Sequence, residues 1–230
     1  SSITATGTAS PISVTGLASA TSYTFTVSAI NSVGTGAPSS ATTAVTATTI
    51  PQAPTIGTAT GANTTASVTF TPGATGGAAV STFTATSTPS SITGSAASSP
   101  ITVSGLTNGT GYTFTVTATN TNGTSLASAA SNSTIPATVP VAPTIGTLSP
   151  TANIAFGSNP TMSIAFTANG DGGATITSYK YSTDGGTNYL TASGTTSPLT
   201  LPTQSTGSAF VAGTSYSVLL KAVNVKGDSS

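Results

Sequence analysis

The stretch Tyr112-Thr113-Phe114-Thr115-Val116-Thr117-Ala118-Thr119 alternates apolar residues with threonine along its whole length. Successive side chains of a β-strand point to opposite faces of a sheet. The alternation therefore predicts a strand that buries its aromatic and aliphatic residues and turns its threonines to solvent. Residues 120–123 have the composition of a hairpin turn, and we expect a final strand over residues 125–134.

Three segments upstream carry related patterns. Residues 66–71 and 80–86 alternate, with Gly76-Gly77 forming a turn between them, and residues 101–103 form a shorter apolar segment. No segment has a helical period. Short strands at a spacing of about 8 to 12 residues are typical of an all-β protein built from seven-stranded β-sandwiches.

Internal repeats divide the chain into modules. Tyr23-Thr24-Phe25-Thr26-Val27 recurs in the quoted strand at a shift of 89 residues, and residues 53–58 recur as 142–147 at the same shift. A third, more diverged copy places Gly172-Gly173 where the second has Gly76-Gly77. We predict the second half of a module over residues 1–50, a complete module over residues 51–139, and a module lacking its last strand over residues 140–230. Two interpretations stay open: a segment of a longer array, or a subunit whose partial ends are completed by neighbouring copies through strand addition.

A corner motif precedes the quoted strand. In Gly105-Leu106-Thr107-Asn108-Gly109-Thr110-Gly111-Tyr112 a leucine lies six positions before a tyrosine. Leu17 and Tyr23 repeat this spacing, as do Phe210 and Tyr216. The motif resembles the corner of fibronectin type III domains, and residues 71–77 resemble a loop usual in bacterial and viral copies of that family. The resemblance implies tandem immunoglobulin-like sandwiches in which the hydroxyl groups of Tyr23, Tyr112 and Tyr216 bond back to the backbone. Phe70 and Phe166 stand where the family has a core tryptophan.

The charged residues are few and uninformative for catalysis. The chain has three acidic groups, three basic groups, no histidine and no cysteine. A serine nucleophile therefore lacks an imidazole base, and we expect no catalytic, cofactor-binding or metal site. Asp171 and Asp184 precede glycines, which is turn chemistry, although calcium could use such loops. Lys221 is expected on the outward face of its strand.

Three weaker patterns admit a functional interpretation. Lys226-Gly227-Asp228 lies in a loop where the family can display a similar tripeptide for adhesion, and it is also an ordinary turn sequence. Tyr179 and Tyr181 share one face and fit a core, while Tyr189 fits a loop tip, although exposed tyrosines could also bind sugars. The glycosylation sequence Asn-x-Ser/Thr occurs at four candidate sites: Asn63, Asn108, Asn122 and Asn132.

The surface composition suggests a built-in structural role. The first 170 residues contain no aspartate, glutamate, lysine, arginine or histidine, so edge strands lack charged residues that block strand pairing. Residues 50–54 and 135–143 are proline-bearing linkers, which we expect to be extended, semi-rigid and poor in hydrogen-bond donors. We predict a non-enzymatic stalk, fibre or filament part on a microbial cell surface or virion, outside the cell, with neighbouring copies or modules as partners, and neither nucleic acid nor a membrane span. The alternatives are an adhesin that binds glycans or a partner protein, and a spacer in a secreted polysaccharide-degrading enzyme.

Overall fold

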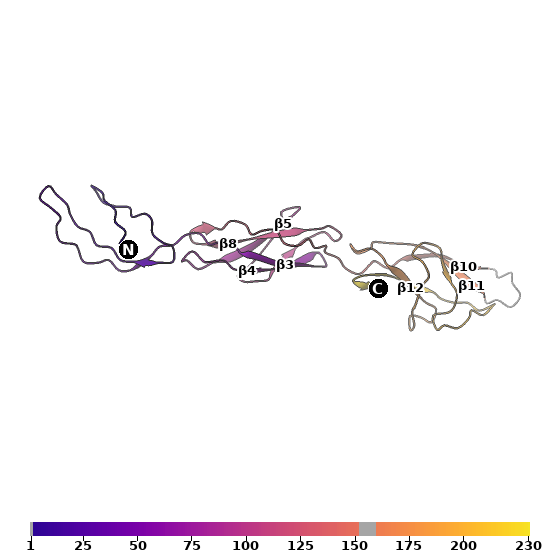
Figure 1. Ribbon diagram of the computed structural model, residues 1–230. Coiled ribbons are helices and arrows are strands. Elements are labelled where there is room, and N and C mark those ends of the chain that lie inside the picture. The colour runs from indigo at the N-terminus through magenta and orange to yellow at the C-terminus, as the bar shows by residue number, and fades with distance from the viewer. Residues whose placement is uncertain (1, 152–159) are drawn as a thin grey trace. The chain divides into compact units, whose positions relative to one another are not determined.

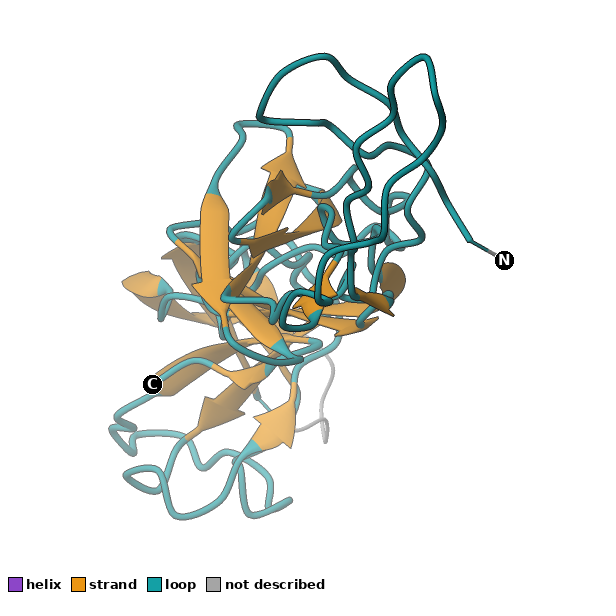
Figure 2. Cartoon of the chain, turned by 90° about the vertical axis from the view of Figure 1, so that its left-hand side faces the viewer, coloured by secondary structure: helices purple, strands orange, loops and turns teal. Residues whose placement is uncertain are grey.

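The computed structural model of the chain describes residues 2–151 and 160–230, and over these residues it contains strands and loops but no helix (Figures 1 and 2). The described chain divides into two compact units. The first combines Ser1–Ala59, Ser67–Val103 and Thr113–Asn132, and the second combines Thr60–Ala66, Ser104–Tyr112 and Ser133–Ser230. The all-β prediction is confirmed.

Seven strands of the central region form two antiparallel sheets. The first sheet has the order β3-β4-β7 and the second β6-β5-β8-β9. The strands are β3 (Thr55–Ala62), β4 (Thr65–Thr71), β5 (Thr82–Thr88), β6 (Thr93–Ala96), β7 (Ile101–Ser104), β8 (Thr113–Asn120) and β9 (Gly123–Thr124). Phe70 on β4 packs on Phe83 of β5, with ring centroids 4.7 Å apart. The two sheets thus share a core, as in a β-sandwich.

The outward face of the four-stranded sheet is a grid of threonines. Along the β5–β8 ladder, Thr82, Thr84, Thr86 and Thr88 lie opposite Thr119, Thr117, Thr115 and Thr113. The residues between them, including Phe83 and Phe114, are buried. The alternation read from the sequence is therefore a two-faced strand, although β5 begins two residues later than expected.

The same two-sheet arrangement recurs after residue 140. One sheet has the order β10-β11-β14 and the other β13-β12-β15-β16. The strands are β10 (Thr144–Thr151), β11 (Thr161–Thr167), β12 (Ser178–Ser182), β13 (Leu190–Thr191), β14 (Leu199–Leu201), β15 (Leu219–Asn224) and β16 (Gly227–Asp228). Phe166 packs on Tyr179 at 4.6 Å between ring centroids. Phe70 and Phe166 therefore both occupy core positions.

Residues before 50 form a smaller paired segment. β1 (Ser22–Tyr23) pairs with β2 (Val45–Thr46), so that Tyr23 lies opposite Val45. Toward the hairpin end, the N–H of Thr42 donates to the carbonyl of Phe25 and the N–H of Ser39 to that of Val27. From one of these hydrogen bonds to the next, the donor moves by three residues, from Thr42 to Ser39, while the acceptor moves by two, from Phe25 to Val27.

The prediction of a regular strand over residues 125–134 is wrong. As in the first segment, successive hydrogen-bonding residues lie three apart here and two apart on β8. The N–H groups of Ser125, Ser128 and Ser131 donate to the carbonyls of Ala118, Val116 and Phe114, at 2.8 to 2.9 Å. In return, each serine Oγ accepts the N–H of the same β8 residue at 2.9 to 3.0 Å. We call Ser125, Ser128 and Ser131 the serine ladder. At each of these three positions a serine hydroxyl replaces the backbone carbonyl as the acceptor of the β8 N–H group, so the segment follows β8 without being a β-strand.

Candidate functional site

The three aspartates are all occupied within their own neighbourhoods. Asp171 accepts the N–H of Gly173 at 2.8 Å, in a turn. Asp228 pairs with Lys180 at 2.9 Å, with both side chains about one-third exposed. Among residues 2–151 and 160–230 no group of three acidic, histidine or cysteine side chains converges on a metal-sized site. If Lys226-Gly227-Asp228 served in adhesion, it would have to use the Asp228 carboxylate, which is already paired with the Lys180 ammonium group.

Asp184 organises the turn that follows β12. Its carboxylate accepts the N–H of Asn188 at 3.0 Å, the Asn188 amide at 2.7 Å and the Ser182 hydroxyl at 2.7 Å. These hydrogen bonds, led by the Asn188 backbone N–H, lower the pKa of Asp184 to about 2 because they stabilise the ionised carboxylate. The site is a closed turn rather than an open ligand cage.

Of the three candidate tyrosines of the third module, Tyr179 and Tyr181 lie in the core as predicted, and Tyr189 lies directly before β13. Tyr179 and Tyr181 are buried, at 2% and 1% exposure, and burial raises the pKa of Tyr179. Tyr189 is partly buried, and the ammonium of Lys221 lies 4.8 Å from its ring centroid. A single tyrosine already covered by a lysine is a poor platform for a sugar.

Each corner tyrosine bonds back across five residues. The hydroxyl of Tyr23 accepts the N–H of Ala18 at 2.9 Å, that of Tyr112 accepts Thr107 at 3.2 Å, and that of Tyr216 accepts Val211 at 3.0 Å. The bonds hold the loop against the strand that follows it. Their role is structural.

The four candidate glycosylation asparagines differ in the state of the side-chain amide. The Nδ2 groups of Asn108, Asn122 and Asn132 donate to Asn63 Oδ1, to the Thr49 carbonyl and to the Ala59 carbonyl. Asn63 is exposed and serves as an acceptor through Oδ1. Glycosylation of any of the four stays a prediction.

The most distinctive polar site is what we call the first junction. It joins the 74–77 loop and Asn120 to Thr49 and Gln52 of the first linker, which from here on includes Thr49. The N–H of Thr49 donates to the carbonyl of Gly76 at 2.8 Å, and that of Gln52 to Ala74 at 2.9 Å. Asn120 is only 5% exposed, and its Nδ2 donates to the carbonyls of Thr49 and Thr75 at 2.8 and 2.9 Å. The linker is therefore hydrogen-bonded to the module that follows it.

A second junction repeats these contacts within the second unit. The N–H of Thr138 donates to Gly172 at 2.9 Å and that of Val141 to Gly170 at 2.8 Å. Asn224, 4% exposed, donates through Nδ2 to the carbonyls of Thr138 and Asp171, both at 2.8 Å. The expectation that the linkers are poor in donors is wrong, because the residues between their prolines donate to the adjacent loop.

Glycines permit the close approach at both junctions. Gly76 and Gly77 have φ of 71° and 86°, and a Cβ on Gly76 would lie 2.5 Å from the carbonyl oxygen of Thr49. Gly172 has φ of 74°, and a Cβ there would collide with the carbonyl oxygens of Thr138 and Val139. The paired glycines are thus needed for backbone contact as well as for the turn.

The junction asparagines were missed from the sequence, although a signal was present. Asn31, Asn120 and Asn224 each lie eight residues after a corner tyrosine. In all three, Oδ1 accepts the N–H two residues on, at 2.8 to 2.9 Å. A hairpin turn alone is a sufficient explanation of asparagine at position 120, so the sequence by itself does not indicate the contact with the linker.

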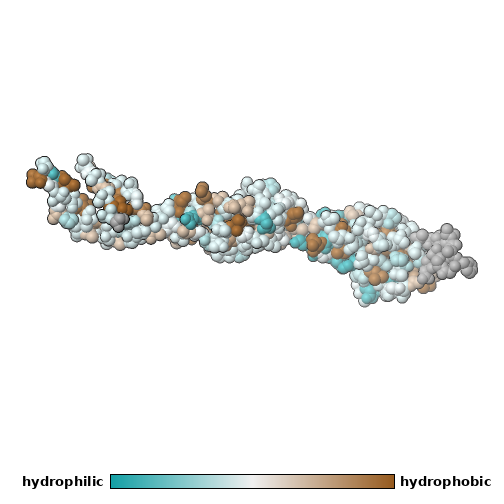
Figure 3. Space-filling model, viewed as in Figure 1, coloured by the Kyte–Doolittle hydropathy of each residue, from teal (hydrophilic) through white to brown (hydrophobic). Residues whose placement is uncertain are grey.

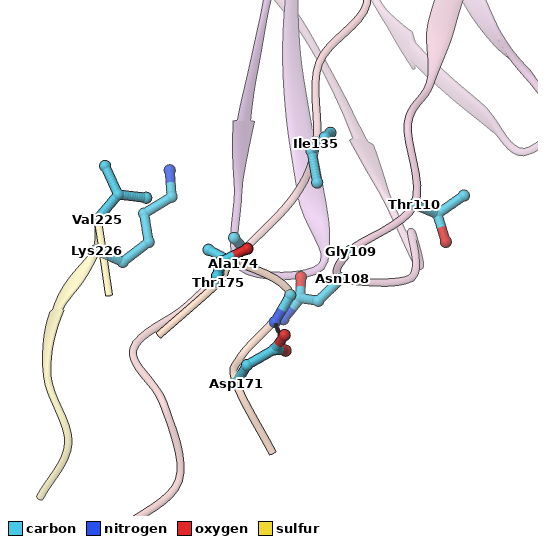
Figure 4. Close-up of a pocket in the computed structure, with 11 residues that line it drawn as sticks. Asn108, Gly109, Thr110, Ile135, Asp171, Ala174, Thr175, Val225 and Lys226 are labelled. Carbon is cyan, nitrogen blue, oxygen red and sulfur yellow. Dashed lines mark hydrogen bonds between the residues drawn. The ribbon is translucent and has the colours of Figure 1, made fainter. Parts of the chain in front are cut away.

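A recess beside the second junction measures about 690 Å³ (Figure 4). Asn108, Asp171 and Lys226 line it, together with the apolar side chains of Ile135 and Val225. Figure 4 shows Val225 and Lys226 entering from the β15–β16 turn and Asp171 from the loop below Asn108. Its one carboxylate accepts the Gly173 N–H, so the recess presents no convergent set of free polar groups.

Comparisons with known proteins address the fold. Residues 51–134 match the fibronectin type III domain family. The chain is similar to the crystal structure of the chicken CNTN1 FN1–FN3 domains, with 20% identity over 78% of this chain and 64% of that one, at a TM-score of 0.37. It is also similar to the titin kinase and its flanking domains, with 17% identity over 51% of this chain and 27% of that one, at a TM-score of 0.33.

Two further findings complete the comparison. No curated protein matches the chain. Within the described residues no helix has the length and apolar character needed to cross a membrane. The matched segment coincides with the strands of the central sandwich, which carries the corner tyrosine Tyr112 and the first-junction residues Gly76 and Asn120. Residues 51–134 therefore have the fibronectin type III fold.

Proposed function

We propose that the chain is a structural part of an extracellular array, serving as a stalk, fibre or filament on a microbial cell or a virion. A modular structural or binding role without catalysis is what the fold itself indicates. The finer assignment rests on one observation: the same junction, built from a linker carbonyl, a paired-glycine loop and a buried asparagine, occurs twice along one chain.

The junction supports an array because it is specific and buried. A buried amide needs partners, and each junction asparagine finds them on the preceding linker. A flexible tether would leave the linker carbonyl of Thr49 or Thr138 to water. Hydrogen bonds from two directions instead restrict rotation of the linker against the next module.

The surface supports the same assignment. Figure 3 shows a face that is mostly near neutral in hydropathy, with few strongly polar patches. Only 3% of the residues are charged, so contacts made by this surface respond weakly to salt. Such a surface suits a part with permanent neighbours better than a diffusing enzyme.

Electron microscopy of the purified chain tests the array. We expect images of the wild-type chain to show a narrow distribution of angles between successive modules, and those of Asn120→Ala with Asn224→Ala to show a broad one. Asn63→Ala is the matched control, because Asn63 is exposed and lies outside both junctions. Equally broad angles in all three proteins would contradict the proposal.

The location is tested separately on the native source. Antibodies raised against the chain should label intact cells or virions by immunogold without permeabilisation. Labelling that appears only after the cells are opened would overturn the extracellular assignment while leaving the array intact.

A further inference from the structure

We infer that the serine ladder closes the open edge of the central sandwich against strand addition, and so replaces the charged residues that usually protect such edges. The partner excluded is a β-strand of a second copy of this chain. The inference concerns a conformational device and is independent of where the protein works.

The edge needs such protection on physical grounds. An unpaired edge strand presents alternating N–H and C=O groups that template another strand, and lysine, glutamate or proline usually interrupts it. Residues 120–134 contain no charged residue and no proline. The segment is rich in alanine, and Leu126 is 80% exposed. By composition alone it is an aggregation-prone edge.

The ladder removes the template. Each serine uses its own N–H on β8, and its hydroxyl donates to the carbonyl of the next residue: Leu126, Ala129 and Asn132, at 2.7 to 2.8 Å. One carbonyl in every three is therefore taken within the segment. The backbone N–H and C=O groups of the segment that these bonds do not use recur every three residues, whereas a strand added to the edge needs partner groups every two residues. The two periods fall out of register after one pair.

The end of the ladder also protects the opposite sheet. Asn132 follows Ser131, and its amide both accepts the N–H of Ala59 at 2.8 Å and donates to the Ala59 carbonyl at 3.0 Å. Ala59 lies in β3, the edge strand of the three-stranded sheet. A side-chain amide thus occupies both backbone groups that an added strand would use at this point.

The device recurs in the repeats. Ser39 and Thr42 accept the N–H groups of Val27 and Phe25 at 3.1 Å, and Ser229 accepts that of Ala222 at 3.1 Å. At position 42 a threonine supplies the hydroxyl, so a β-methyl is compatible with this bond.

The test uses the full chain and single substitutions in the middle of the ladder. Ser128→Ala removes the hydroxyl that accepts the Val116 N–H and frees the Ala129 carbonyl, while Ser128→Thr retains a hydroxyl. Ser98→Ala is the control, because Ser98 is exposed and outside the ladder. Association is followed by light scattering after gel filtration over a concentration series, at a temperature where circular dichroism shows every variant folded.

We expect Ser128→Ala to associate at concentrations where the wild type, Ser128→Thr and Ser98→Ala remain monomeric. Adding Leu126→Lys to Ser128→Ala should restore the monomer, since an exposed lysine blocks strand pairing. A purely destabilising effect would not be reversed by that lysine. A folded Ser128→Ala chain that stays monomeric, or association that Leu126→Lys leaves unchanged, would overturn the inference.

Discussion

The side-chain amide of Asn120 lies 2.8 Å from the carbonyl oxygen of Thr49, 71 residues earlier in the chain. Asn224 makes the equivalent bond to Thr138. In each case a buried polar side chain from the last hairpin of one module reaches the linker that precedes it. This bond fixes the linker to the module that follows it, and it can be tested directly.

Replacing Asn120 by alanine should destabilise the junction. The variant removes the Asn120 donor from the carbonyl of Thr75 and leaves the carbonyl of Thr49 with the Asn122 amide alone, and a buried unpaired group costs about 1 to 3 kcal/mol. Chemical denaturation monitored by circular dichroism measures this free energy of unfolding. Asn120→Asp is the discriminating companion, because it keeps an oxygen for the Asn122 N–H but turns an acceptor toward two carbonyls. If Asn120→Asp were as stable as the wild type, the junction bond would have no energetic role.

Replacing Gly77 by alanine should lower the free energy of unfolding more than replacing Gly105 by alanine. The two glycines have φ of 86° and 83°, so alanine suffers the same backbone strain of about 1 to 2 kcal/mol at either position. A Cβ on Gly77 would also lie 2.9 Å from the Cα of Ala20, whereas one on Gly105 meets nothing within 4 Å. The difference between the unfolding free energies of the two alanine variants isolates the contact with Ala20. Equal losses would show that the turn alone requires glycine at position 77.

The sequence predicted those features that obey a period of two. The alternation over residues 112–119 predicted β8, and the leucine-to-tyrosine spacing marked the corner that precedes it. The final segment was misread because its serines recur every third residue, at 125, 128 and 131, a period that strand analysis does not seek. The junctions were missed because Gly76-Gly77 and Asn120 each have a sufficient local explanation as turn residues. Only the folded chain shows that the same residues also contact a linker distant in sequence.

Removing the hydroxyl of Tyr112 should weaken the corner by about 1 kcal/mol, because the N–H of Thr107 loses an acceptor in a partly buried place. Tyr112→Phe retains the ring, which is 2% exposed, so hydrophobic burial is unchanged. Tyr189→Phe is the control, since its ring faces Lys221 at the surface. Thermal unfolding of the two variants gives the comparison. A loss in Tyr189→Phe as large as in Tyr112→Phe would contradict the assigned role of the corner hydroxyl.

The stability of the chain should be nearly independent of pH between about 5 and 9. The chain has no histidine, and ordinary carboxyl and lysine groups titrate outside this range. The folded state holds the pKa of Asp184 at about 2, below its usual 3.8. A depressed carboxyl pKa contributes stability that is present above the unfolded value and is lost as pH falls through the folded value. The melting temperature should therefore decline between about pH 4 and pH 2.

A second decline is expected in alkali, with the opposite proton balance. Burial raises the pKa of Tyr179 above 10.0, so the folded state holds its proton where the unfolded state releases it, and stability falls as pH rises past 10. Asp184→Asn should flatten the acid limb and leave the alkaline limb unchanged, while Tyr179→Phe should do the reverse. Melting curves recorded from pH 2 to 11 separate the two. An acid limb that persists unchanged in Asp184→Asn would show that the Asp184 turn does not couple folding to pH.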